Sequence, residues 1–151
     1  MASGLKCLSP YLAVKGAADA IDFYRQAFGA VERFRLIDPL DGRVGHAELM
    51  FGDTVVMLSD EYPDFGALAP DTIGGSPVKL HLEVDDAEAA TARAVSFGAV
   101  VLRPVRDEFH GSRTAMVSCP FGYSWFLDQR IEDVSTDEMQ ARWAASTETG
   151  A

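Results

Sequence analysis

An internal repeat constrains this chain more than any other feature of its sequence. The segment Phe28-Gly-Ala-Val31 recurs as Phe97-Gly-Ala-Val100, so the two copies are offset by 69 residues, from 28 to 97. The same offset relates Gly42 to Gly111. A repeat at a fixed period marks a structural unit that the chain uses more than once. The sequence therefore predicts two copies of one folding module.

Each copy has the pattern of one helix and four strands. Apolar residues recur at helical spacing from Ala17 to Phe28, and Gly29 follows where a C-terminal cap is expected. Alternation of apolar and polar residues predicts the strands. The expected strands are Leu5–Val14, Val31–Ile37, Val44–Phe51 and Thr54–Ser59 in the first copy and 78–84, 100–102, 114–118 and 124–128 in the second, which has its helix at Asp86–Phe97. The order predicts an α+β fold of two tandem βαβββ modules.

The remaining segments complete the expected organisation. We expect one domain over residues 1–151, with modules at about 5–60 and 78–130 and a linker at 61–77. Ser135 and Glu138 form a capping box, which predicts a C-terminal helix at about 135–146.

Charge and cysteine content limit the classes of partner. The chain has 13 Lys and Arg against 23 Asp and Glu, a formal net charge of −10, which argues against nucleic acid or an anionic membrane as a partner. No apolar run is long enough to span a bilayer. The amino terminus lacks a signal-peptide pattern, and the chain has two cysteines, Cys7 and Cys119. We therefore expect a cytoplasmic protein with reduced thiols.

Strand alternation sorts the side chains onto two faces of the sheet. Leu8, Leu12, Val14, Ala47 and Leu49 are expected to pack on the helices. The opposite face combines imidazoles, carboxylates and an amine with aromatic and thioether groups, a mixture typical of a ligand cavity. The candidate ligand-binding residues are Tyr11, His46, Glu48, Met57, Lys79, His81 and Phe126. A solvated polar face is the alternative interpretation.

Several segments resemble the vicinal-oxygen-chelate superfamily, which includes glyoxalase I, extradiol dioxygenases and bleomycin-resistance proteins. These segments are Ser9-Pro-Tyr-Leu-Ala-Val14, Ala20-Ile-Asp-Phe-Tyr24 and Phe28-Gly-Ala. Gly45-His-Ala-Glu-Leu49 and Pro120-Phe-Gly-Tyr-Ser-Trp125 resemble its PhnB-like branch more narrowly. The resemblance implies modules whose strands form a curled mixed sheet around a shared cup, with the helices outside. It also implies a homodimer that binds a small molecule.

The resemblance also assigns metal ligands to four strand positions. In this chain they are occupied by Ser9, Met57, Lys79 and Phe126, none of which is a usual ligand for a catalytic divalent ion. We therefore predict that the family's metal site is missing and that no cofactor is bound. A shift of two residues in this alignment would bring in His81.

Two functions remain open at the level of the sequence. The first is a bleomycin-resistance-like protein that binds a small molecule without a metal ion. The alternative is a metal-dependent lyase or dioxygenase whose displaced site uses His46, Glu48 and His81. His46 and Glu48 share one strand face and could also form an acid–base pair, as could His81 and Glu83. The sequence does not identify a catalytic residue.

Overall fold

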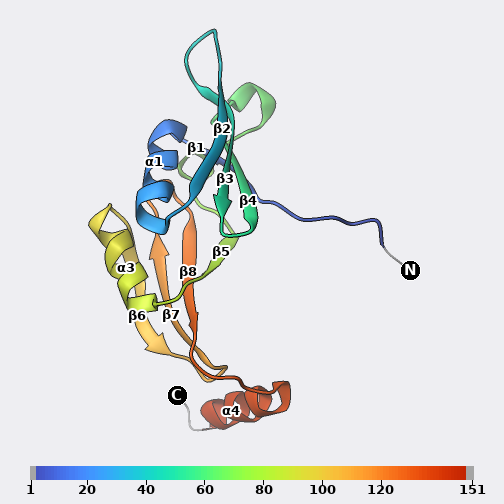
Figure 1. Cartoon of the computed structure of the whole chain (residues 1–151), viewed down its shortest axis with the longest axis vertical. Helices are drawn as coiled ribbons and strands as arrows, with labels where there is room; N and C mark the ends of the chain where they lie inside the picture. Colours follow the sequence, from blue (N-terminus) through green and yellow to red (C-terminus); the bar gives the residue numbers. More distant parts are fainter. Residues whose placement is uncertain (1–2, 149–151) are drawn as a thin grey trace. The chain divides into compact units, whose positions relative to one another are not determined.

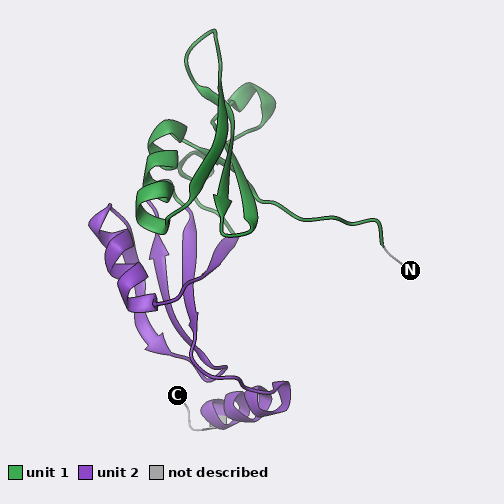
Figure 2. Cartoon of the chain, in the orientation of Figure 1, with its two compact units in different colours: residues 1–77, 120–122 green, residues 78–119, 123–151 purple. Residues whose placement is uncertain are grey.

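The computed structural model describes residues 3–148 and divides the chain into two compact units (Figure 2). Unit 1 runs up to Pro77 and includes Pro120–Gly122, whereas unit 2 comprises Val78–Cys119 and the residues from Tyr123 onward. Both units contain the element order β-α-β-β-β. The predicted α+β fold of two tandem βαβββ modules is therefore confirmed.

Unit 1 is a four-stranded mixed sheet with one long helix. The strand order is β1-β4-β3-β2, in which β1 runs parallel to β4 and the other neighbours are antiparallel. Its elements are β1 (Tyr11–Val14), α1 (Ala17–Phe28), β2 (Val31–Ile37), β3 (Val44–Phe51), β4 (Thr54–Asp60), the short 3-10 helix η1 (Pro63–Phe65) and α2 (Pro70–Ile73).

The core of unit 1 lies between α1 and one face of its sheet (Figure 1). Ile21 and Tyr24 of α1 are fully buried, as are Leu49 of β3 and Leu58 of β4. Phe121 also belongs to this unit, and its ring centroid lies 6.2 Å from that of Tyr24. This burial leaves the opposite face of the sheet for polar and mixed side chains.

Unit 2 repeats the arrangement with the strand order β5-β8-β7-β6, and β5 runs parallel to β8. Neither sheet closes on itself, because each has two edge strands. The elements of unit 2 are β5 (Lys79–Glu83), α3 (Ala87–Ser96), β6 (Val100–Asp107), β7 (Ser112–Ser118), β8 (Ser124–Arg130) and α4 (Thr136–Glu148).

The first strand is shorter than predicted. It begins at Tyr11 rather than Leu5, and Leu8, which was expected to pack on a helix, is 91% exposed. The strand begins late because it pairs with β4 only from Pro10 onward. Met57 N–H donates to the Pro10 carbonyl, and Tyr11 and Met57 are the first pair in register. Alternation alone does not make a strand where no neighbouring strand is present.

The second strand of the second module, β6, is longer than predicted. It continues through Pro104 to Asp107 instead of ending at Leu102. Proline lacks an N–H donor, but β6 is an edge strand, where one missing donor is tolerated. The C-terminal helix α4 runs from Thr136 to Glu148, and Ser135 Oγ accepts a hydrogen bond from Glu138 N–H before its first turn.

Within the described range 3–148, no helix has the length and apolar character that crossing a bilayer requires.

Candidate functional site

Strand β3 places two candidate side chains on the face of the sheet opposite α1. Ala47 and Leu49 are fully buried, so the alternate residues His46 and Glu48 point to the other face. Their side chains are partly buried, with 25% of His46 and 14% of Glu48 exposed. The predicted sharing of a face is confirmed for this pair.

Four side chains of unit 1 form a continuous run of hydrogen bonds, which we call the polar chain. The Tyr11 hydroxyl lies 2.8 Å from His46 Nδ1, and His46 Nε2 lies 3.0 Å from Glu48 Oε2. Arg33 Nη1 donates to the other oxygen, Glu48 Oε1, at 3.2 Å. The polar chain ends at Tyr11, a residue that is 52% exposed.

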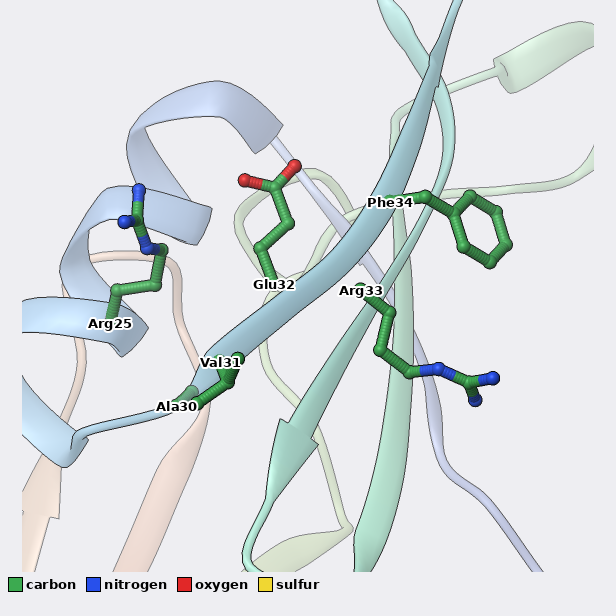
Figure 3. Close-up of a pocket in the computed structure, with 6 residues that line it drawn as sticks. All are labelled: Arg25, Ala30, Val31, Glu32, Arg33 and Phe34. Carbon is green, nitrogen blue, oxygen red and sulfur yellow. The ribbon is translucent and has the colours of Figure 1, made fainter.

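Arg33 reaches Glu48 because of an irregularity in β2 that sequence reasoning missed. Glu32 pairs with Leu49 and Phe34 pairs with Glu48, so Arg33 is an extra residue between two register positions. Figure 3 shows the result: Arg33 and Phe34 project to the same side of β2, while Glu32 projects to the other. The open depression drawn there, about 370 Å³, lies along this edge strand.

Apolar side chains surround the polar chain. Met57 on β4 is in register with both Tyr11 and Glu48, which puts it on the same face. The Phe34 ring centroid lies 5.8 Å from that of His46, and the Tyr11 ring centroid lies 5.4 Å from it. The predicted set Tyr11, His46, Glu48 and Met57 is thus brought together in unit 1, with Arg33 and Phe34 added.

In unit 2, His81 and Phe126 lie opposite each other in the parallel register of β5 and β8. The partner of His81 is Asp128 rather than Glu83: His81 Nε2 lies 2.8 Å from Asp128 Oδ2. Asp128 follows Phe126 by two residues on the same strand, so alternation could have identified it.

His81, Phe126 and Asp128 form part of the wall of an open depression of about 300 Å³. Phe109 adds a second aromatic ring, and the remaining lining residues are polar or charged. They are Arg103, Arg106, Glu108, His110 and Thr114.

Glu108 holds two arginines at the edge of this depression. It accepts a hydrogen bond from Arg106 Nε at 2.7 Å and lies 3.5 Å from Arg103 Nη1. Burial raises the pKa of the Glu108 carboxyl, but the hydrogen bond from Arg106 and the two positive charges outweigh it and leave the pKa below the ordinary 4.5. The carboxylate is therefore ionised at neutral pH and keeps both guanidinium groups in place.

Lys79 stands apart from the other candidates. It is the first residue of β5, it is exposed, and its register partner is Ser124. Among the ion pairs of the described residues, none involves Lys79.

The residues at the four expected metal positions do not suit a divalent cation. Lys79 would bring an ammonium group and Phe126 a phenyl ring, neither of which is a metal ligand. Met57 carries a soft thioether, which favours Cu(I) over the usual catalytic ions. Among the side chains of residues 3–148, no group of three or more His, Cys, Asp or Glu is placed to hold a metal ion.

Comparison with known proteins gives one family. Residues 7–127 match the model of the Glyoxalase/Bleomycin resistance protein/Dioxygenase superfamily. An uncharacterized protein of Mycobacterium tuberculosis is 43% identical over 137 residues, which covers 89% of this chain and 80% of that protein. An uncharacterized protein of Arabidopsis thaliana is 34% identical over 128 residues, covering 80% of this chain and 75% of its own length.

Solved structures show the same fold. The X-ray structure of an Arabidopsis thaliana gene product superposes with a TM-score of 0.66 at 29% identity and covers 82% of this chain and 98% of that one. A protein from Pseudomonas aeruginosa gives a TM-score of 0.68 at 21% identity, with 85% and 100% of the two chains covered.

Proposed function

Because this chain belongs to the Glyoxalase/Bleomycin resistance protein/Dioxygenase superfamily, we propose that it binds a small organic molecule without the help of a metal ion. The ligand-binding side chains are Tyr11, His46, Glu48 and Met57 in unit 1 and Lys79, His81 and Phe126 in unit 2. We also assign it to the PhnB-like branch, on the strength of the Gly45–Leu49 and Pro120–Trp125 motifs.

The depression of unit 2 carries this proposal. Its volume of about 300 Å³ falls at the lower end of small-molecule sites, which usually combine apolar walls with a few polar groups. Phe126 and Phe109 provide aromatic surface, and His81 and Arg103 are polar groups in its wall. The unsuitable donor set at the metal positions supports recognition by these side chains alone.

The metal-free part of the proposal is tested by elemental analysis of the purified protein. We expect zinc, nickel, iron and manganese to be far below one ion per chain, also after incubation with each metal and removal of the excess. A stoichiometric ion that is lost in the His46→Ala and His81→Ala variants would instead support the metal-dependent lyase or dioxygenase.

Ligand binding is tested by thermal shift with a panel of aromatic carboxylates and metal-free bleomycin. We expect compounds that raise the melting temperature of the native protein to lose this effect in Phe126→Ala. The matched control is Phe65→Ala, which removes a phenyl ring that is 85% exposed and outside the depression. Equal shifts in both variants would contradict the placement of the ligand at Phe126.

A further inference from the structure

We propose that the polar chain of unit 1 recognises a ligand by an acidic hydroxyl group, such as that of a phenol, and accepts its proton. This inference rests on the proposed function and names the chemistry of the group that the ligand presents. It requires three features: a defined direction for each hydrogen bond, a free acceptor on Tyr11, and a base that is stabilised when it becomes charged.

The direction of the hydrogen bonds follows from Glu48. An ionised carboxylate only accepts, so His46 Nε2 must carry the proton that it shares with Glu48 Oε2 at 3.0 Å. In the neutral imidazole, Nδ1 is then the acceptor, and it takes the Tyr11 hydroxyl proton at 2.8 Å. Arg33 donates to the other oxygen, Glu48 Oε1, at 3.2 Å, so both oxygens of this carboxylate act as acceptors.

This arrangement leaves the Tyr11 oxygen as an acceptor for the ligand. Its only proton points to His46, and half of the residue is exposed, so an incoming group must donate a hydrogen bond to it. An acidic hydroxyl does this, whereas an ether does not. The phenyl ring of Phe34 and the thioether of Met57 lie on the same face and suit an aromatic ligand.

The proton transfer balances without any other reactant. The ligand O–H bond breaks and its proton joins the Tyr11 oxygen, while the original Tyr11 proton moves to His46 Nδ1. The products are a ligand oxyanion that accepts a hydrogen bond from Tyr11 and an imidazolium that is paired with Glu48. The charged groups that face this site are Arg33 and Glu48, so the new imidazolium lies beside a carboxylate already in place.

Comparison of the two modules argues that the carboxylate of Glu48 is not required for folding of the sheet. Glu48 is opposite Met57 in unit 1, and the corresponding position opposite Phe126 in unit 2 is Met116. The same sheet therefore forms with an apolar residue in place of Glu48. Unit 2 carries a different polar set on this face, in which His81 pairs with Asp128 and Arg103 donates to Thr114.

The test uses para-nitrophenol as the probe, because its phenolate absorbs visible light, and para-nitroanisole as a matched ether that has no proton to give. At a pH below the pKa of free para-nitrophenol, we expect the native protein to raise the phenolate band and to bind the phenol about tenfold more tightly than the ether. Tyr11→Phe should lose the band and bind both compounds equally.

Two further variants separate proton transfer from folding. Glu48→Gln keeps a hydrogen-bonding side chain but removes the charge, so it should bind the phenol with a much weaker phenolate band. Tyr62→Phe is the control, since it removes a tyrosine hydroxyl of the same unit that binds Asp38 at 3.0 Å outside the polar chain, and it should behave as the native protein.

The outcomes distinguish this inference from the proposed function. Equal binding of phenol and ether without a phenolate band would overturn the inference and leave small-molecule binding intact. A band that persists in Tyr11→Phe would also overturn it. If neither compound binds, the inference fails, and the proposed function is judged by its own ligand panel.

Discussion

Asp60 accepts three backbone hydrogen bonds from two segments of unit 1 with one carboxylate. Its Oδ1 accepts hydrogen bonds from the N–H groups of Gly16 and Ala17, at the start of α1, and its Oδ2 accepts from Val44 N–H at 2.7 Å. The start of α1 has no cap of its own, because its N-cap residue is Gly16. A carboxylate from β4 therefore supplies the acceptor that the helix lacks.

Replacement of Asp60 by Ala should destabilise the protein by about 2–3 kcal/mol, because three N–H groups lose a charged acceptor. Asp60→Asn keeps one carbonyl oxygen and should lose about half as much. Urea unfolding followed by circular dichroism measures both values. Asp64→Ala is the control, since this exposed residue of η1 should change the free energy of unfolding by less than about 0.5 kcal/mol. Equal losses for the two alanine variants would contradict the capping role.

At the scale of elements, the two modules place a left-handed glycine in equivalent hairpin loops that have different surroundings. Gly42 lies in the β2–β3 turn and Gly111 in the β6–β7 turn, with φ of +80° and +95°. A Cβ atom on Gly42 would meet open space, whereas one on Gly111 would collide with the Glu132 carbonyl. The Gly111 carbonyl also accepts hydrogen bonds from the N–H groups of Ile131 and Glu132. The repeat therefore preserves the left-handed glycine, while residues after β8 pack against Gly111.

Alanine at each glycine should separate backbone strain from packing. Gly42→Ala should cost about 1–2 kcal/mol, the strain of a left-handed alanine. Gly111→Ala should cost at least about 2 kcal/mol more, because the new methyl group meets backbone that cannot rotate away. Chemical denaturation of the two variants under identical conditions gives the comparison. A loss for Gly42→Ala that matches or exceeds the loss for Gly111→Ala would show that packing at Gly111 is unimportant.

The elements also show where sequence reasoning succeeds and where it stops. Helical spacing and strand alternation depend on neighbours along the chain, so α1, α3 and the shared face of His46 and Glu48 were predicted correctly. Arg33 was missed because its position depends on the register between β2 and β3. Leu8 was misplaced for a related reason: a strand needs a partner, and β4 begins to pair only at Pro10. Contacts between strands that are distant in the sequence cannot be predicted from the order of residues along one strand.

At the scale of the whole molecule, a net charge of −10 coexists with carboxylates that are held by arginines. The hydrogen bond from Arg35 lowers the pKa of Glu32 from its ordinary 4.5, and the one from Arg113 lowers the pKa of Asp107 from 3.8. Protonation of these carboxylates removes their contacts with arginine and so destabilises the folded protein. It also reduces the electrostatic repulsion across the acidic surface, which stabilises the folded protein and opposes that loss. The specific contacts are short, at 2.6 Å and 2.7 Å, whereas the general repulsion is spread over the surface and screened by salt.

We therefore expect the free energy of unfolding to fall as the pH decreases from about 5 to about 3. A carboxyl group whose folded pKa lies below its unfolded value stabilises the protein above the unfolded value and loses this contribution as the pH falls through the folded one. Glu32→Gln should be less stable than the native protein near pH 7 and nearly equal to it near pH 3. Urea unfolding across this range tests the prediction, with Glu83→Gln as a variant that removes an exposed carboxylate of β5. A native protein that becomes more stable on acidification at physiological salt would show that surface repulsion outweighs the arginine contacts.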